Sequence, residues 1–204
     1  MSSNYFPTDQ QALWNLIEER ASPDSDPAEI DQRIWKTFGV DGAIVVTDLA
    51  GFTRRIAEVG LIHCLEIVYQ SQRLLRPIIE QHRGVVIEVV ADSKLVWFDD
   101  VDDSINCSVA MQRACAAYNK GKRPVDQILL CLGIGYGHTL KVDNARLAGP
   151  QVNLASKLGE DTAEGYEILV TDSVKEHATP NEELEFVLTG ESFPGTLEVY
   201  RVNY

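Results

Sequence analysis

The chain has 204 residues, of which 45% are hydrophobic, which suits one domain with a proper core plus an extension. Eighteen basic residues against 31 acidic ones leave a net charge of −13, which repels nucleic acid and anionic membranes, so we expect neither as a partner. No run approaches the roughly 20 apolar residues of a membrane span, and the N-terminus lacks the regions of a signal peptide. We therefore expect a cytoplasmic protein.

Residues 1–39 are predicted to form a helical N-terminal extension. Residues 8–20 have the pattern of an amphipathic helix whose apolar stripe is Leu13, Leu16 and Ile17. After a linker, Pro27 suits the first turn of a second helix, which Gly39 ends and whose apolar face is Ile30, Ile34, Trp35 and Phe38. We expect this extension to pack on the main domain or on a partner subunit.

Residues 40–204 are predicted to form the main domain. Its first half is expected to begin with a strand at 42–48 and a helical stretch at 52–81 with a candidate break at Gly60. A hairpin of strands 84–90 and 94–98, a helix at 102–118 and a long strand at 127–137 are expected to follow. The second half is expected to contain a helix at 151–158, a strand at 166–170 and a helical turn at 172–177. Strands 184–189 and 196–202 are expected to form a closing pair. The order strand–helix–strand–strand–helix–strand predicts a ferredoxin-like α/β (α+β) sandwich, with an antiparallel or mixed sheet flanked by helices.

Two isolated acids stand at the ends of predicted strands. The apolar run of residues 44–46 leads to Asp48, and Asp92 lies near the tip of the predicted hairpin. Either aspartate alone could be a helix cap or a turn former. Together on adjacent strands they are better explained by a divalent-metal site for phosphoryl transfer, because a triphosphate beside two carboxylates is repelled without cations. Gly51 follows Asp48 closely, beside backbone N–H groups that could hold phosphate.

A second polar pair lies on the helix predicted over residues 151–158. Asn153 and Lys157 are four residues apart and therefore share one face. An amide and a cation side by side could orient a ribose and neutralise a transition state of phosphoryl transfer. The alternative is a solvated helix face.

Three strings resemble the class III nucleotidyl cyclase domain over roughly residues 40–204: Thr47-Asp48-Leu49-Ala50-Gly51-Phe52-Thr53, Val90-Ala91-Asp92, and Gly149-Pro-Gln-Val-Asn153-Leu-Ala-Ser-Lys157-Leu. The resemblance implies that Asp48 and Asp92 bind two Mg²⁺ or Mn²⁺ ions, with the Leu49 carbonyl as a further ligand. It implies that the β- and γ-phosphates are held by the backbone amides of Ala50, Gly51, Phe52 and Thr53. Asn153 would orient the ribose, and Lys157 would stand where the family usually has its transition-state arginine.

The same resemblance implies a homodimer with two equivalent sites, because the family's sites form between two antiparallel subunits. The reaction it implies is attack of the ribose 3′-hydroxyl on the α-phosphorus, with pyrophosphate leaving. Thr189 occupies the place of a phosphate-contacting lysine found in many relatives, so other cations must serve. Arg54 and Arg55 are candidates, and the alternative for them is a solvated helix face.

Two positions that read the base in this family are altered. Adenylate cyclases usually have Lys and Asp where this chain has Glu88 and Arg146, and guanylate cyclases usually have Glu at the first. A carboxylate accepts from guanine N1–H and N2–H, whereas an arginine donates to a base carbonyl, so the residues leave GTP and UTP open. The alternative is that Glu88 and Arg146 simply pair with each other.

The whole chain looks like the bacterial pyrimidine cyclases of the Pycsar anti-phage system. That resemblance implies conversion of UTP to 3′,5′-cyclic UMP, which a separate effector protein reads in anti-phage defence. The alternatives are an adenylate, guanylate or cytidylate cyclase, or a catalytically silent cyclase-like domain that binds nucleotide.

Overall fold

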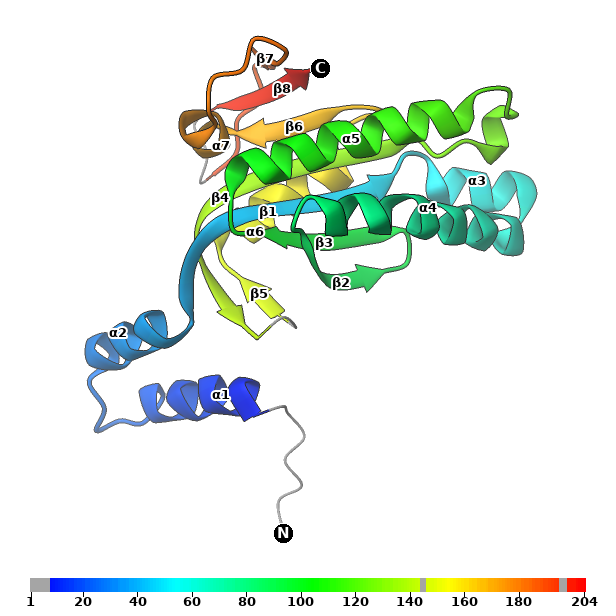
Figure 1. Cartoon of the computed structure of the whole chain (residues 1–204). Coiled ribbons are helices and arrows are strands. Elements are labelled where there is room, and N and C mark those ends of the chain that lie inside the picture. Colours follow the sequence, from blue (N-terminus) through cyan, green and yellow to red (C-terminus); the bar gives the residue numbers. More distant parts are fainter. Residues whose placement is uncertain (1–7, 144–145, 195–197) are drawn as a thin grey trace.

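The computed structural model describes residues 8–143, 146–194 and 198–204 (Figure 1). The helices of these residues are α1 Thr8–Arg20, α2 Pro27–Phe38, α3 Phe52–Val59, α4 Leu61–Gln81, α5 Val101–Asn119, α6 Pro150–Ser156 and α7 Asp172–His177, with a 3₁₀ turn at Pro124–Asp126 and a π-helical segment at Lys157–Thr162. The strands are β1 Gly39–Leu49, β2 Val85–Val90, β3 Ser93–Phe98, β4 Leu130–Val142, β5 Arg146–Ala148, β6 Ile168–Thr171, β7 Glu185–Leu188 and β8 Val199–Asn203.

The strands form one mixed sheet in the order β2-β3-β1-β4-β6-β8-β7, with β5 paired to β4. All neighbouring strands are antiparallel except β4 and β6. The succession β1, α3 with α4, β2, β3, α5 and β4 is the ferredoxin-like order that the sequence predicts, so the predicted fold class is confirmed.

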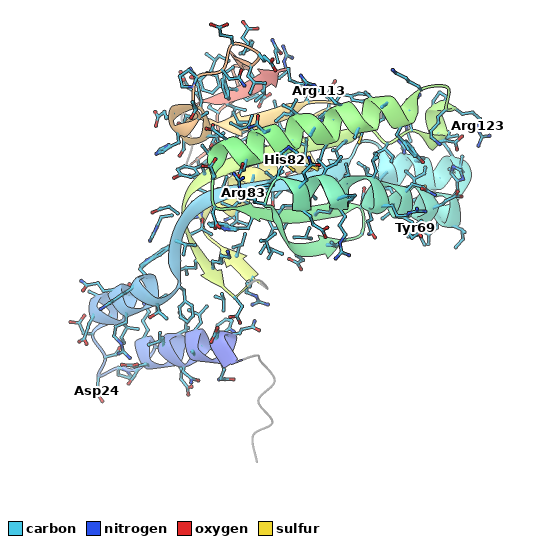
Figure 2. All side chains as sticks on the ribbon, in the orientation of Figure 1. Asp24, Tyr69, His82, Arg83, Arg113 and Arg123 are labelled. Atoms are coloured by element: carbon cyan, nitrogen blue, oxygen red, sulfur yellow. The ribbon has the colours of Figure 1, made fainter. Side chains whose placement is uncertain are left out.

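The sheet has a different helix layer on each face. In Figure 1 α4 and α5 lie across one face, and α6 lies behind the other. Because side chains alternate along a strand, Val45 of β1 joins the large core under α4 and α5, whereas Val46 packs with Trp97 and Ala155 on the α6 side. Charged side chains such as Arg113 of α5 extend outward from the helix layer (Figure 2).

Glycines let α6 approach the sheet closely. A Cβ atom on Gly133 of β4 would lie 2.2 Å from the Ala155 carbonyl oxygen, and one on Gly135 would lie 2.6 Å from that of Gln151. Just after α6, a Cβ on Gly159 would lie 2.6 Å from the Val46 carbonyl oxygen. The backbone of α6 and of the π-helical segment therefore rests directly on β1 and β4.

The extension packs on the end of β4 that projects beyond the rest of the sheet (Figure 1). Its contact is an apolar cluster made by Leu13, Leu16, Ile30, Ile34, Phe38, Leu140 and Val142. Packing on the main domain is thus observed within one chain. The prediction that Ile17 belongs to the packed apolar stripe of α1 is wrong, because Ile17 is 37% exposed. Trp35 of α2 is also partly exposed, and its ring stacks on that of His138 with centroids 4.7 Å apart.

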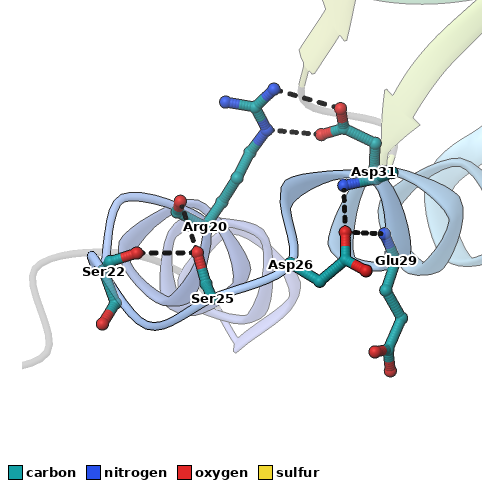
Figure 3. A network of polar contacts seen from close by, with 7 residues as sticks. Arg20, Ser22, Ser25, Asp26, Glu29 and Asp31 are labelled. Carbon is teal, nitrogen blue, oxygen red and sulfur yellow. Dashed lines mark hydrogen bonds and ion pairs between the residues drawn. The ribbon is translucent and has the colours of Figure 1, made fainter.

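Polar contacts fix the turn between α1 and α2 (Figure 3). The Asp26 carboxylate accepts from the backbone N–H of Ala28 at 2.9 Å and caps α2. Arg20 at the end of α1 binds Asp31 of α2 through two hydrogen bonds, of 2.5 and 3.1 Å, which lower the pKa of that carboxyl. The Ser25 hydroxyl donates to the Arg20 carbonyl at 3.0 Å and closes the turn. These contacts join the two helices into one hairpin.

Several predicted boundaries shift in the structure. The helical stretch is broken at Gly60, as expected, with φ of 87°. Strand β4 continues past its predicted end at residue 137 to Val142, because β5 supplies a partner for Leu140–Val142. The predicted helix 151–158 ends its α-helical part at Ser156 and continues as a π-helix. Within the described residues, no helix combines the length and apolarity that crossing a bilayer requires.

Candidate active site

The two predicted acids converge at one end of the central strands. Asp48 is the penultimate residue of β1, and Asp92 lies in the two-residue turn between β2 and β3, after Ala91 with φ of 52°. Since β1 pairs with β3, this turn lies beside the end of β1. The Ser93 hydroxyl donates to Asp48 Oδ1 at 3.0 Å, and Asp48 is close enough to Asp92 to perturb the pKa of its carboxyl.

The electrostatics of this pair favour a bound cation. Burial and the Asp48 carboxylate raise the pKa of Asp92 from 3.8 to about 6, although the backbone N–H groups of Asp92 and Leu49 act in the opposite direction. Asp92 is only 8% exposed. The side-chain carboxylates and the backbone carbonyl of Leu49 are oxygen donors of the kind that Mg²⁺ and Mn²⁺ prefer. The residues therefore fit a divalent ion, which the Asp48 and Asp92 carboxylates and the Leu49 carbonyl would hold.

No group of three or more His, Cys, Asp or Glu side chains within the described ranges is placed to hold a metal ion. A metal at Asp48 and Asp92 would therefore need further oxygen ligands from the main chain, water or a bound phosphate.

The structure adds two charged residues that the sequence analysis missed. The Lys94 side chain is 4% exposed, and its amine has no hydrogen-bond partner within the described residues. Burial lowers the pKa of Lys94, while the nearby Asp92 carboxylate acts against that change. On the opposite side, burial and the Asp48 charge raise the pKa of Glu160, and the Ser93 hydroxyl opposes them. Lys94 could have been found from the sequence, because it lies two residues after Asp92. Glu160 could not, because the π-helical segment is what brings it near Asp48.

The candidate phosphate loop lies between β1 and α3. Gly51 has φ of 72° and begins α3 without a side-chain cap, so the first-turn amides of Phe52 and Thr53 are available to an anion. The Ala50 N–H already donates to the Leu129 carbonyl at 2.8 Å. The amides that can hold phosphate in this conformation are therefore fewer than the four that the resemblance implies.

The two candidate phosphate cations have different environments. Arg55 is 6% exposed and donates to the carbonyls of Gln127 at 2.8 Å and Ala50 at 3.3 Å, so it braces the loop from behind. Arg54 is exposed and lies 3.5 Å from Glu58. Of the two, Arg54 is the one whose guanidinium is accessible from solvent.

Asn153 and Lys157 share one exposed face of the helix, as predicted. Lys157 Nζ lies 2.9 Å from Asp161 and 5.9 Å from the centroid of the Phe193 ring. Neither residue has a hydrogen bond or ion pair with Asp48 or Asp92. One chain therefore brings the two acids together but leaves the Asn153/Lys157 face pointing outward.

Glu88 lines a cavity of about 210 Å³ on the α6 side of the sheet, together with Leu147, Val152, Ser156 and Glu160. The Arg146 guanidinium lies elsewhere, against the side-chain amide of Gln10 in α1. With that amide assigned so that its oxygen faces the guanidinium, the oxygen accepts from Arg146 Nη1 at 3.1 Å and Nη2 at 3.2 Å. Glu88 and Arg146 form no ion pair with each other in the described structure, so the alternative that they pair is wrong for this conformation.

Comparison with solved structures identifies the architecture. The adenylyl cyclase CyaB from P. aeruginosa superimposes with a TM-score of 0.67 at 18% identity, covering 81% of this chain and 95% of that one. The guanylyl cyclase Cya2 superimposes with a TM-score of 0.63 at 21% identity, covering 80% and 90%. The chain has the class III nucleotidyl cyclase fold. A bacterial light-regulated adenylyl cyclase aligns with 98% of this cyclase-fold chain and 66% of its own, with a TM-score of 0.69 at 18% identity.

Two curated proteins are similar to this chain in sequence, and one of them is named as a cyclase. No family model matches the chain. A putative adenylate cyclase 3 of Rhizobium meliloti is 27% identical over 149 residues, which are 72% of this chain and 25% of that protein. The serine/threonine-protein kinase pkn2 of Myxococcus xanthus is 24% identical over 131 residues, 64% of this chain and 16% of the kinase. The chain spans a quarter or less of these relatives. None of these matches points to a pyrimidine cyclase, so that resemblance stays a prediction.

Proposed function

We propose that the protein is a nucleotidyl cyclase, which converts a nucleoside triphosphate into a 3′,5′-cyclic nucleotide and pyrophosphate. The observation that carries the proposal is the convergence of Asp48 and Asp92 at the end of β1, within a cyclase fold. A silent nucleotide-binding domain has no chemical need of two carboxylates that repel each other and raise the pKa of Asp92.

The chain's own residues define the parts of the reaction. Asp48, Asp92 and the Leu49 carbonyl would hold Mg²⁺ or Mn²⁺, two ions per site in the full proposal. Bound there, such ions lower the pKa of the ribose 3′-hydroxyl and offset the charge on the leaving pyrophosphate. The amides of Phe52 and Thr53 orient the β- and γ-phosphates at the start of α3.

We further propose that the active form is an antiparallel homodimer. Asn153 and Lys157 are exposed and have no bond to the acid pair of their own chain. In a two-fold dimer the same residues of one subunit can face the acids of the other, which creates two equivalent sites. Asn153 then orients the ribose, and Lys157 places a positive charge beside the phosphorus under attack.

Glu88 supports a base that carries a ring N–H group. A carboxylate only accepts hydrogen bonds, uracil N3 and guanine N1 carry a hydrogen, and adenine N1 and cytosine N3 do not. We propose UTP as the substrate and cyclic UMP as the product; the preference over GTP rests on the pyrimidine-cyclase resemblance alone. The same resemblance suggests a separate effector that reads the product in anti-phage defence. GTP is the second candidate, favoured by the same property of Glu88.

An intersubunit complementation experiment tests the activity and the dimer together. Asp48→Ala and Asn153→Ala should each abolish product formation from UTP, GTP, ATP and CTP with Mn²⁺. Mixing the two inactive variants should restore about a quarter of wild-type activity, because half of the dimers are mixed and each has one intact site of two.

Two results would count against the proposal. If Asp48→Ala keeps full turnover, the metal assignment is wrong. If the wild type shows a nucleotide-dependent thermal shift but forms no cyclic product from any of the four nucleotides, the protein is a binding domain and not a cyclase.

A further inference from the structure

The N-terminal extension contacts one of the two base-reading candidates. Gln10 lies near the start of α1, and its side-chain amide faces both terminal nitrogens of Arg146. In the amide orientation that satisfies both groups, the Gln10 oxygen accepts from these nitrogens at 3.1 and 3.2 Å. The α1–α2 hairpin that carries Gln10 is itself anchored, since Ile34 and Phe38 are buried against Val142 of β4. Gln10 is therefore held on a supported element beside the β4–β5 hairpin (Figure 1).

Strand β5 directs Arg146 away from the cavity that Glu88 lines. Its middle residue, Leu147, is 8% exposed and forms part of the cavity wall. Successive side chains of a strand point to opposite faces, so Arg146 leaves β5 on the other side. In this arrangement Glu88 faces the cavity without Arg146 beside it.

We propose that Gln10 is a specificity-determining residue, which keeps Arg146 out of the base cavity and so leaves Glu88 without an ion-pair partner. This inference rests on the proposed nucleotide site at Glu88. It assigns the N-terminal extension a role in substrate selection, because Gln10 belongs to the extension and Arg146 to the main domain.

The direction of the effect follows from the chemistry of the two side chains. Arg146 leaves β5 on the face opposite the cavity, and Gln10 holds its guanidinium there. Strands β2 and β5 lie near each other, so the long side chain of an Arg146 released from Gln10 can reach around β5 toward Glu88. A guanidinium paired with a carboxylate uses the oxygens that would otherwise accept the base N–H. Loss of Gln10 should therefore weaken binding of nucleotides with a ring N–H more than binding of those without one.

The experiment compares full-length variants by calorimetry, using α,β-methylene UTP and α,β-methylene ATP with Mn²⁺, so that no turnover is needed. Gln10→Ala should lower the preference for the UTP analogue about fivefold, at the lower end of common coupling strengths. Gln10→Glu keeps an oxygen acceptor and should preserve the preference. Gln11→Ala is the matched control, because Gln11 is the next residue of the same helix and donates to Asn15, at 2.9 Å.

A double-mutant comparison separates this role from a merely structural one. In an Arg146→Ala background, Gln10→Ala should cause no further change in preference. An unchanged preference in the single variant, or an equal change with and without Arg146, would overturn the inference. If the wild type binds neither analogue, the proposed nucleotide site fails first and the inference fails with it.

Discussion

Replacing Asp92 by Asn should stabilise the metal-free protein while abolishing cyclase activity. The pKa of Asp92 rises from 3.8 to about 6 on folding, a difference of about 2. At about 1.4 kcal/mol for each pKa unit, the ionised carboxylate costs the folded state about 3 kcal/mol at neutral pH. Asn is uncharged and keeps an oxygen that accepts from backbone N–H groups, so most of this cost should disappear.

The sign of the pH dependence follows from proton binding. Between pH 3.8 and about 6 the folded protein binds a proton at Asp92 that the unfolded chain releases, so stability at this site falls as pH rises through that window. The advantage of Asp92→Asn should therefore be near zero at pH 4 and reach about 3 kcal/mol by pH 7.5, which is roughly 6 to 12 °C in melting temperature for a chain of this size.

Thermal and urea denaturation with a chelator, at pH 4 and pH 7.5, provide the measurement. Asp24→Asn is the control, because Asp24 is exposed in the turn between α1 and α2 (Figure 2), far from the acid pair in the chain. Added Mn²⁺ should stabilise the wild type and leave Asp92→Asn unchanged. A variant that is less stable than the wild type at pH 7.5, or whose advantage does not grow with pH, would refute the reasoning.

Three further substitutions test the surroundings of the site by urea denaturation. Arg55→Ala should cost about 2 kcal/mol, because two backbone carbonyls lose a buried charged donor; no loss would mean that Arg55 does not brace the loop. Gly159→Ala should cost about 1–3 kcal/mol, since its Cβ would press on the Val46 carbonyl, and an unchanged midpoint would contradict that close packing. Lys94→Met should raise stability by about 1 kcal/mol by removing an unpartnered buried amine; a loss instead would show that the amine has a stabilising partner.

The sequence was informative where the signal is local. Asp48 and Asp92 stand out because a charged residue interrupts an apolar strand pattern, and the break at Gly60 follows from its backbone freedom. The ferredoxin-like order of elements could be predicted because apolar residues recur with a different spacing in helices and in strands. Strand-to-strand register then brings the two acids together without further information.

The remainder depends on contacts between distant segments. The sequence makes Arg55 a candidate phosphate cation, but its guanidinium is buried and donates to the carbonyl of Gln127, 72 residues away. Strand β5 is only three residues long, so it has no periodic pattern and is defined by its pairing with β4. Glu160 approaches Asp48 because a π-helical segment follows α6, and no residue-by-residue pattern announces that change of helix type.

The glycines of β4 have a consequence for the precision of catalysis. Because Gly133 and Gly135 have no side chains, main-chain atoms of α6 lie directly on β4 there, and main-chain atoms have no rotamers to adjust. Buried side chains of Val46, Trp97 and Ala155 fill the rest of this contact. In the proposed cyclase, a helix held in this way would keep Asn153 within the sub-ångström tolerance that positioning a reacting ribose requires.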